Sequence, residues 1–518
     1  MAEGADPVLT PDSPAQFLGN HWIELPDGRY RSRFPPGYPA LLAVAHAVGG
    51  PAAALLVTPL LAALTPALVF IIAGQLVSGW AAVGAAGVVT ALPLLSRLAL
   101  HADSHVAATA VLLLALWSCL AWRASGRARL AFLAGLFAGL VPAVRYAESV
   151  ALLGPLLFAA FFAPSGPARR KGWQAALAGF AIPTLALLLY HWYAYGAPYR
   201  TGYALTNEQT AFSLNQVTSS LTFYARHMSW QTWTVTGLGL FGVGALLSER
   251  STRGAAVLFF GALIPSVLLY SMYYWGDRES AELALRFFLP SLTILGTLAV
   301  VGITRSKMPR SVNLALSLLL AVATVTSLPE SARGASEESQ AAQNGWAVTS
   351  VALEQVPAGA ALIAPRHILE VLEHRGQWKL VPEWLLYGSP GREGLLLPWT
   401  VGDRLAAEHQ TTAALTQIAK GRELRRRYAS IDTRDDNAVL FDDVFDWTGG
   451  GPVYWIAHPA SVPATLPEHL EGQVSQMGEI QLPSLSAGDN VPYWAPQGPL
   501  ALFCLSGSSA SSSIPCPG

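Results

Sequence analysis

Long uncharged apolar segments follow one another through the first two thirds of the chain. Residues 34–96 contain no Asp, Glu, Lys or Arg, a stretch far longer than any buried core helix. Because one helix needs about 20 apolar residues to cross a bilayer, this stretch alone predicts more than one crossing. Segments of spanning length fall near residues 52–78, 80–99, 106–122, 172–192, 231–248, 254–275, 285–304 and 311–328.

The apolar stretch 130–164 differs from these segments. It is too long for one comfortable crossing, and Pro142, Arg145 and Glu148 interrupt it. A charge inside hydrocarbon is costly, so we predict two short helices that turn at Arg145. The chain then has about ten transmembrane helices.

Basic loops test this count, since Lys and Arg near helix ends favour the cytoplasm. With ten crossings, all four basic loops fall on one side of the membrane. With a single crossing over residues 130–164, the first two would fall on opposite sides, so the loops support the hairpin. They are formed by Arg123, Arg127 and Arg129; by Arg169, Arg170 and Lys171; by Arg250 and Arg253; and by Arg305, Lys307 and Arg310.

The opposite face, here called the far side, receives the other loops and the tail from Pro329 onward. Residues 1–33 are polar and hold no signal peptide, because they lack a basic start followed by an apolar core. An external start before an even number of crossings predicts that a further helix precedes Met1 in the intact protein. The far-side loops are residues 1–50, 101–105, the turn at Arg145, 193–230 and 276–284.

The composition changes after residue 328. Residues 329–345 include the polar run SARGASEESQAAQ, which predicts a linker between a transmembrane domain, 51–328, and a soluble domain, 346–518. Expected buried strands alternate with helices in that tail, so we predict a small α/β domain. The strands are expected at 361–365, 378–381, 453–457 and 501–505, and helices at 368–374 and 411–428.

Cysteine usage leaves two alternatives open. Cys119 lies inside an apolar run, whereas Cys504 and Cys516 are close together near the C-terminus. The latter two can form a disulfide in an oxidising compartment, and an unpaired surface pair is equally compatible with their spacing.

Composition excludes several classes of protein. The chain is 52% hydrophobic and 13% charged, against about 25% charged residues in ordinary soluble domains. Its net charge of -1 gives no field that recruits nucleic acid. Walker A, GxSxG, CxxC and HExxH patterns are all absent from the sequence, which argues against ATP-driven pumps and the common serine and zinc hydrolases.

Ionisable residues gather at the far side, where a charge beside hydrocarbon is usually paired or functional. Residues 9–39 hold Asp12, an Asp27-Gly28 turn, three arginines and a rigid Pro-Pro-Gly-Tyr-Pro entry into apolar sequence. Spacing alone favours a solvated loop there. His101, Asp103 and His105 are of the kind that ligates a divalent metal, but a short polar turn between helices explains them as well.

Two arginines stand closer to hydrocarbon. At the hairpin turn, the guanidinium of Arg145 can hold a phosphate in bidentate fashion, and an ion pair with Glu148 at helical spacing is the alternative. Arg286 follows Asp277, Arg278, Glu279 and Glu282 and enters apolar sequence, which predicts a buried anionic partner or ligand unless it snorkels to the headgroups. The loop 193–230, rich in Tyr, Thr, Asn and Gln, suits a sugar but also any membrane interface.

Taken in order, these segments resemble the GT-C membrane glycosyltransferases, in particular the bacterial branch similar to protein mannosyltransferases and lipid A aminoarabinose transferases. The resemblance covers roughly residues 10–330. It departs from the family in showing no transmembrane helix before the first loop, and in Asp12-Ser13 where the family often has Asp-Glu. The matching passages are Asp12, DGRYRSRFPPGYPALLA (27–43), AGLFAGLVPAVRYA (134–147), YGAPYRTGY (195–203) and RFFLP (286–290).

The resemblance implies an α-helical polytopic protein of GT-C type in a bacterial cytoplasmic membrane, with the α/β domain outside the cell membrane. It implies a polyprenyl-phosphate-linked sugar as donor, an acceptor hydroxyl on a lipid, glycan or protein, and inversion with Asp12 as base. It further implies that Arg145, Arg286 and Arg33 bind the donor phosphate, that His105, Glu148, Tyr199 and Tyr203 contact substrate, and that Asp103 is the candidate ligand of an optional divalent metal.

Two other functions remain compatible with the sequence. A transporter or flippase would place ionisable residues near the middle of the membrane and show matched broken helices in two halves, whereas here the charges gather at one face. A non-catalytic assembly or sensor protein would use the soluble tail to bind a partner. A sideways-opening apolar groove lined by Arg145 and Arg286 beneath Asp12 would distinguish the enzyme from both.

Overall fold

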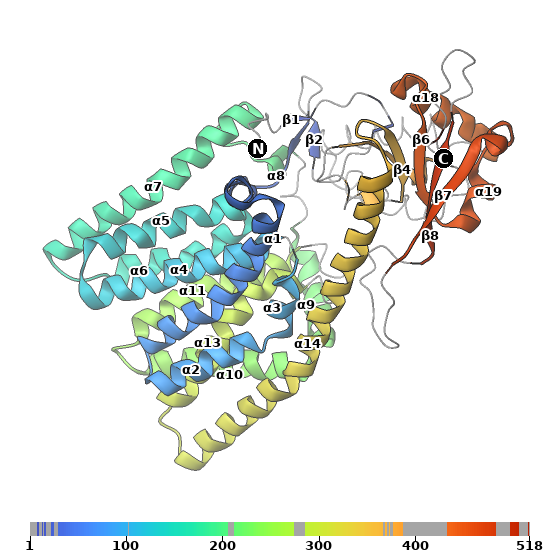
Figure 1. Ribbon diagram of the computed structural model, residues 1–518. Helices are drawn as coiled ribbons and strands as arrows, with labels where there is room; N and C mark the ends of the chain where they lie inside the picture. The colour runs from blue at the N-terminus through green and yellow to red at the C-terminus, as the bar shows by residue number, and fades with distance from the viewer. Residues whose placement is uncertain are drawn as a thin grey trace. The chain divides into compact units, whose positions relative to one another are not determined.

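A computed structural model describes the greater part of the chain, which divides into two compact units (Figure 1). Unit 1 comprises Met1–Pro7 and Arg33–Ser336, and unit 2 comprises Val8–Ser32 and Glu337–Gly518. The described residues are 8–9, 13, 15–16, 22–24, 30–101, 103–205, 212–273, 285–365, 368–369, 372, 377–386, 433–482, 498–506 and 516.

Unit 1 is helical, as its apolar segments predict. Among the described residues, six helices are long and apolar enough to cross a membrane, and three shorter apolar helices accompany them. A multi-pass membrane protein is therefore confirmed, while the count of ten crossings stays a prediction. The larger helices are α1 (Gly37–Gly74), α2 (Gly79–Thr90), α4 (Ser104–Ser125), α5 (Ala128–Val144), α6 (Leu153–Phe162), α7 (Pro167–Tyr195), α9 (Val217–His227), α10 (Trp230–Ser248), α11 (Arg253–Ser271), α13 (Leu289–Arg305) and α14 (Arg310–Gln355).

The helical hairpin expected over residues 130–164 is present. Helix α5 ends at Val144, Arg145 is extended with φ -150° and ψ 117°, and the short helix η1 (Ala147–Leu152) leads into α6. Pro142 lies inside the last turn of α5 and Arg145 is its C-cap residue. The chain therefore reverses at the residue that the charge pattern indicated.

Small residues bring α5 and α7 together (Figure 1). A Cβ on Gly135 would stand 1.9 Å from the carbonyl oxygen of Ala176, and one on Gly179 would stand 2.1 Å from that of Phe132. Close backbone approach of this kind is how helices pack in lipid, where apolar side chains gain little from leaving it. This contact fixes α5 and thus the start of the turn at Arg145.

The basic loops meet at one end of unit 1. Arg123 Nη2, at the end of α4, donates to the carbonyl oxygen of Ser251 at 3.3 Å, in the α10–α11 turn. Arg305 Nη1, at the end of α13, lies 3.0 Å from Glu249 Oε2 in the same turn, and the Arg123 guanidinium lies over the ring of Phe162 at the end of α6. These contacts bring three of the four basic loops together, and the placement of all four on one side of the membrane stays a prediction.

Two stretches placed outside the expected transmembrane helices are helical. Residues 37–48, placed in the loop 1–50, belong to α1, which breaks at Gly49 and Gly50, the latter with φ 70°. The expected linker, 329–345, lies wholly inside α14, and the division between the units falls within that helix. The first segment is rich in Ala and Leu and the second in Ala, Glu and Gln, residues that favour helix whether the exposed face is apolar or polar.

Unit 2 is the expected α/β domain. Its five-stranded sheet has the order β5-β4-β6-β8-β7, parallel between β5, β4 and β6 and antiparallel between β6, β8 and β7. The strands agree with all four predicted positions and add β7. They are β4 (Ala361–Ala364), β5 (Lys379–Pro382), β6 (Val453–Ala457), β7 (Val474–Ile480) and β8 (Leu500–Leu505).

Both faces of the sheet are covered at β4, β6 and β8, which explains why these strands read as unbroken apolar runs. In β6, Val453 and Trp455 belong to one core and Tyr454 and Ile456 to another. Helix α18 (Ala438–Thr448) contributes Phe441 to the first core. Of the expected helices, 411–428 lies outside the described residues.

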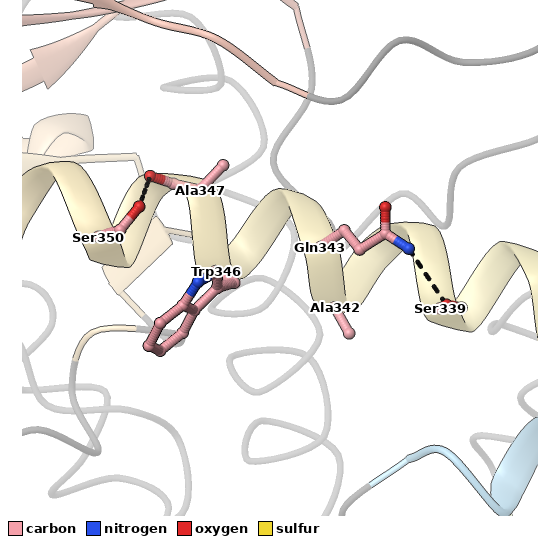
Figure 2. A pocket seen from close by; sticks show the side chains of 6 residues that line it. All are labelled: Ser339, Ala342, Gln343, Trp346, Ala347 and Ser350. Atoms are coloured by element: carbon pink, nitrogen blue, oxygen red, sulfur yellow. Dashed lines mark hydrogen bonds between the residues drawn. The ribbon is translucent and has the colours of Figure 1, made fainter.

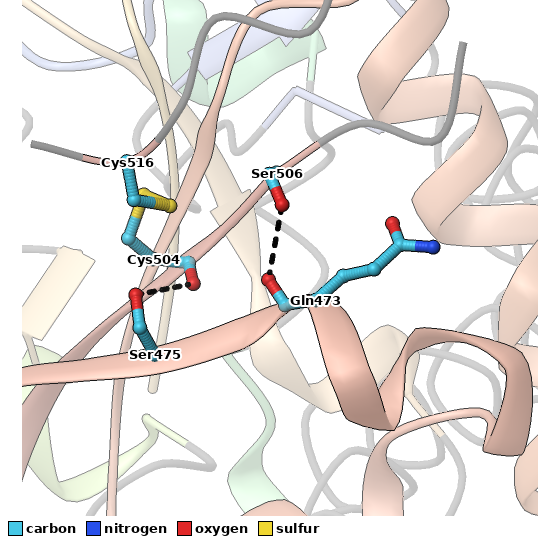
Figure 3. Close-up of a disulfide and its surroundings, with 5 residues drawn as sticks. All are labelled: Gln473, Ser475, Cys504, Ser506 and Cys516. Atoms are coloured by element: carbon cyan, nitrogen blue, oxygen red, sulfur yellow. Dashed lines mark hydrogen bonds between the residues drawn. A yellow bond between two sulfur atoms is a disulfide. The ribbon is translucent and has the colours of Figure 1, made fainter. Parts of the chain in front are cut away.

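Two further features complete unit 2. Strands β1 (Val8–Leu9), β3 (Tyr30–Ser32) and β2 (Trp22–Glu24) form a small antiparallel sheet. Cys504 at the end of β8 is joined to Cys516 by a disulfide (Figure 3). Of the two alternatives for this pair, the structure shows the bonded one.

Candidate active site

Arg145 lies at the turn between α5 and η1 and points its guanidinium at two side chains. Nη1 donates a hydrogen bond to Ser104 Oγ at 3.1 Å, at the start of α4. Nε lies 3.8 Å from Glu148 Oε1, so the ion pair expected at this helical spacing is present but is longer than a hydrogen bond. Within the described part of the chain, Nε makes no hydrogen bond.

Glu148 is held from a second helix. Its side chain is 1% exposed, and Oε1 accepts a hydrogen bond of 2.7 Å from the hydroxyl of Tyr270 in α11. Oε2 accepts no hydrogen bond from any described residue. A buried carboxylate beside an arginine is therefore shared between a tyrosine hydroxyl and a guanidinium, as expected where a charge must be compensated away from water.

The ring of Phe287 joins the two arginines that the sequence singled out. Arg286 and Phe287 lie in η5 (Leu285–Phe288), with the Arg286 guanidinium carbon 4.9 Å from the ring centroid. The Arg145 guanidinium carbon lies 5.9 Å from the same centroid. Both distances fall within the range of cation–π attraction, so one buried ring gathers cations from distant segments.

Further aromatic rings surround Phe287. Tyr270 stacks on it with centroids 5.0 Å apart and an interplanar angle of 23°, and His105 meets it edge-on at 5.3 Å. Tyr273 approaches it edge-on at 5.6 Å. Arg145, Arg286, Glu148 and His105, which the sequence proposed separately, thus lie in one cluster, here called the arginine cluster with Tyr270 and Phe287.

Asp103 is the N-cap residue of α4. Its Oδ1 accepts from the backbone N–H of His105 at 2.8 Å, the usual role of an N-cap aspartate, and Oδ2 lies 3.4 Å from His101 Nδ1. Burial opposes the charged form, but His105, His101 and the backbone hydrogen bond outweigh it and hold the pKa of Asp103 below its ordinary value.

A divalent metal finds no ready ligand set in the described part of the chain. No three His, Cys, Asp or Glu side chains gather there. Both carboxylate oxygens of Asp103 already face the polar hydrogens of the turn. These residues do not fit a metal centre, and we derive no step of the chemistry through one.

Tyr203 and Tyr199 differ in their surroundings. The Tyr203 ring meets Tyr146 edge-on at 5.3 Å and Phe34 at 6.1 Å, and the Arg33 guanidinium lies 5.1 Å from the Phe34 centroid. Tyr199 is 78% exposed. Aromatic contacts therefore run from Tyr146, the residue after Arg145, through Tyr203 to Phe34. Tyr199 lies in the same loop as Tyr203.

A histidine braces this loop. His191 Nε2 lies 2.8 Å from the hydroxyl of Tyr146, and Nδ1 lies 3.2 Å from the carbonyl oxygen of Pro198. Both ring nitrogens are engaged and the side chain is 3% exposed. His191 fixes the segment that carries Tyr199.

Several predicted residues lie outside the described part of the chain. Asp12, the expected base, is among them, as are Asp277, Arg278, Glu279 and Glu282. Conversely, sequence reasoning missed the roles of Tyr270, Phe287 and His191. Phe287 lies in the RFFLP passage and its aromatic character beside Arg286 was a usable signal, whereas Tyr270 looks like any tyrosine near a helix end.

A hollow of about 570 Å³ lies elsewhere, along one face of α14 in unit 2 (Figure 2). The exposed ring of Trp346 is its only large side chain among the lining residues. Gln343 Nε2 donates to Ser339 Oγ at 3.4 Å, and Ser350 Oγ donates to the Ala347 carbonyl at 3.0 Å. These polar groups thus form hydrogen bonds within their own helix. The candidate site is therefore placed at the arginine cluster, which holds the ionisable side chains.

Comparisons with known proteins agree with this fold. No protein-family model matches the chain, and no protein of curated function matches it. ArnT from Cupriavidus metallidurans, solved bound to undecaprenyl phosphate, is similar in structure, with TM-score 0.50 and 13% identity over 94% of this chain and 89% of that one. This likeness shows the fold.

Two larger proteins give weaker matches. The Archaeoglobus fulgidus oligosaccharyltransferase in its apo form has TM-score 0.46 and 12% identity, covering 72% of this chain and 58% of that one. The arabinofuranosyltransferase AftD from Mycobacteria has TM-score 0.49 and 13% identity, covering 91% of this chain and 35% of that one. The chain thus spans less than two thirds of either protein.

Proposed function

We propose that this multi-pass membrane protein, which has the GT-C fold, is a glycosyltransferase that moves a sugar from a polyprenyl-phosphate donor to an acceptor hydroxyl. The fold is that of ArnT, whose structure holds undecaprenyl phosphate. The proposal rests above all on one observation, the convergence of Arg145 and Arg286 on the ring of Phe287.

Two guanidinium groups around one ring suit a phosphate. Like charges repel each other in a medium of low dielectric constant, and Glu148 supplies one carboxylate in the arginine cluster. A phosphate brings further negative charge and oxygen acceptors in the geometry that guanidinium groups match. Arg145 and Arg286 would then stabilise the charge that develops on the leaving polyprenyl phosphate.

The reaction would proceed by displacement with inversion. The acceptor oxygen forms a bond to the anomeric carbon, while the bond from that carbon to the phosphate oxygen breaks and its electron pair leaves with polyprenyl phosphate. The acceptor proton passes to the carboxylate of Asp12, acting as general base. This role for Asp12 follows from the resemblance of its loop to the family.

The aromatic residues beside the cluster would hold the sugar or the acceptor. The ring of Tyr203 contacts that of Tyr146, and Tyr199, which precedes Tyr203 in the same loop, is exposed. Arg33 stacks on Phe34 next to Tyr203 and would add a second contact to the phosphate side. His105 is buried against Phe287 and Glu148 against Tyr270, so both would act through the cluster's shape and charge.

The location follows from the charge pattern. Basic loops favour the cytoplasm. The end of unit 1 at which these loops lie would therefore face the cytoplasm, and the arginine cluster would face the far side. The disulfide Cys504–Cys516 is consistent with an extracytoplasmic soluble domain, 346–518. We propose a bacterial inner-membrane location, with residues 51–328 as the transferase domain and a lipid, glycan or protein as acceptor.

The decisive experiment reconstitutes the full chain in proteoliposomes with a radiolabelled polyprenyl-phosphate sugar and a mixed pool of envelope acceptors. Transfer of label to acceptor, with release of polyprenyl phosphate, supports the proposal. Arg145→Ala and Arg286→Ala should each abolish donor binding or transfer. Movement of intact donor across the bilayer without cleavage would instead indicate a flippase, and binding of the tail to a protein without turnover an assembly factor.

A further inference from the structure

A single carboxylate oxygen, Glu148 Oε1, faces both Tyr270 and Arg145. The tyrosine hydroxyl donates to it at 2.7 Å, while Arg145 Nε stands 3.8 Å away. A charge-assisted N–H···O bond is normally about 2.7–2.9 Å long. The guanidinium is therefore close enough to its counter-charge for compensation, yet its Nε–H is not used by the carboxylate.

We propose that Tyr270 is a positioning residue, whose hydroxyl holds the Glu148 carboxylate short of Arg145 and so keeps the guanidinium available to an anionic ligand. The ligand is the phosphate of the polyprenyl donor, so this inference rests on the proposed function and deepens it. The Tyr270 hydroxyl also interacts with the Arg145 guanidinium itself; in this proposal its effect on donor binding passes through Glu148.

The arrangement solves a conflict of charges. A buried arginine without a counter-charge is costly so close to hydrocarbon. A carboxylate bonded directly to the guanidinium would remove that cost, but it would also occupy the donors that a phosphate needs, because the carboxylate and phosphate compete for the same geometry. A carboxylate retained nearby by a different donor compensates the charge and leaves those donors open.

The hydroxyl has a fixed place from which to act. The Tyr270 ring is 2% exposed and stacks on Phe287, the ring that also carries the Arg145 guanidinium. On the other side of Arg145, Ser104 Oγ accepts from Nη1. Arg145 is thus oriented by Ser104 and Phe287, and the distance to Glu148 is set by Tyr270.

Tyr270→Phe tests the proposal because it removes the hydroxyl and keeps the stacked ring. The freed carboxylate should close on Arg145, and the KM for the polyprenyl-phosphate sugar should rise on the order of tenfold while kcat changes little, as expected for a hydrogen bond to a charged group that controls donor binding. Glu148→Gln removes the competing charge and should tighten binding of undecaprenyl phosphate, measured as thermal stabilisation of the full chain in nanodiscs.

The double variant gives the sharpest result. If Tyr270 acts through Glu148, adding Tyr270→Phe to Glu148→Gln should no longer weaken binding, so the two effects are not additive. Tyr38→Phe is a matched control: it also removes a buried tyrosine hydroxyl, bonded at 2.6 Å to Thr58 Oγ1. It should lower stability by a similar amount and leave donor KM unchanged.

The outcomes separate the two proposals. A wild-type chain that neither binds undecaprenyl phosphate nor transfers sugar overturns the proposed function together with this inference. A wild-type chain that does both, but in which Tyr270→Phe weakens binding equally with and without Glu148→Gln, overturns the positioning role alone. Should Tyr270→Phe not fold, Glu148→Gln decides by itself: weaker binding of undecaprenyl phosphate would overturn the inference.

Discussion

The guanidinium of Arg286 lies over the ring of its own neighbour, Phe287, with 4.9 Å between the guanidinium carbon and the ring centroid. Adjacent side chains rarely need each other in this way, since an arginine at a membrane surface can extend to the headgroups. Here the second guanidinium, that of Arg145, shares the same ring. Phe287 therefore contacts both arginines that the sequence singled out.

Phe287→Leu should weaken binding of undecaprenyl phosphate roughly tenfold, because each cation–π contact contributes about 0.5–2 kcal/mol. The change keeps an apolar side chain at a 6% exposed position, so the helical unit should still fold. Thermal stabilisation by the lipid in nanodiscs measures the effect.

Phe288→Leu is the matched control for that variant. Phe288 is 9% exposed and meets Tyr224 edge-on at 4.7 Å and Tyr270 edge-on at 6.0 Å. It should lose similar packing energy and retain donor binding. Equal losses of lipid binding in the two variants would mean that packing, and not the cation–π platform, explains the result.

Asp12→Asn should reduce sugar transfer by at least roughly a hundredfold while donor binding persists, since a general base contributes about 10²–10⁴ in rate. Single-turnover transfer and lipid binding, measured on the same sample, separate the two effects. Asp103→Ala is the comparison, because it removes an N-cap and should cost about 1 kcal/mol of stability with transfer largely retained. Full transfer by Asp12→Asn would assign the base elsewhere.

The overall fold was within reach of the sequence because hydrocarbon imposes a simple rule. Backbone polar groups in lipid must bond within their own helix, so apolar runs locate helices, and the charges at Arg145 and Glu148 located the turn between α5 and η1. The expected linker at 329–345 contains the division between the units and is helical, because polarity shows which surface meets water, but not whether the backbone leaves the helix.

The candidate site was predictable only in part. Arg145 and Arg286 stood out because charges near hydrocarbon are rare, yet nothing in the sequence placed them on one ring. Tyr270 could not be found this way, since its importance comes from a hydrogen bond to Glu148 across 122 positions of sequence. Contacts of that kind depend on how helices pack, which apolar periodicity does not specify.

The side assignment of the loops can be tested by cysteine labelling in intact cells. Ser125→Cys, at the exposed end of α4 in the basic end of unit 1, should react with a membrane-impermeant maleimide only after the cells are opened. Tyr199→Cys, at a position 78% exposed, should react in intact cells. The reverse pattern would place the arginine cluster on the cytoplasmic side.

The disulfide between Cys504 and Cys516 offers an independent test of the same assignment. If unit 2 lies in an oxidising compartment, the denatured chain purified without reductant should show one titratable thiol, that of Cys119, out of the three cysteines in the sequence. Replacing both bonded cysteines by Ser should destabilise unit 2 by about 3 kcal/mol, as expected for closing a loop of about a dozen residues, and should make β8 more sensitive to limited proteolysis. Cys119→Ala is the control, since it should leave the proteolysis pattern of unit 2 unchanged. Three titratable thiols in wild-type protein would contradict both the bond in the native chain and the extracytoplasmic placement argued from it. This result would not depend on the role of the arginine cluster.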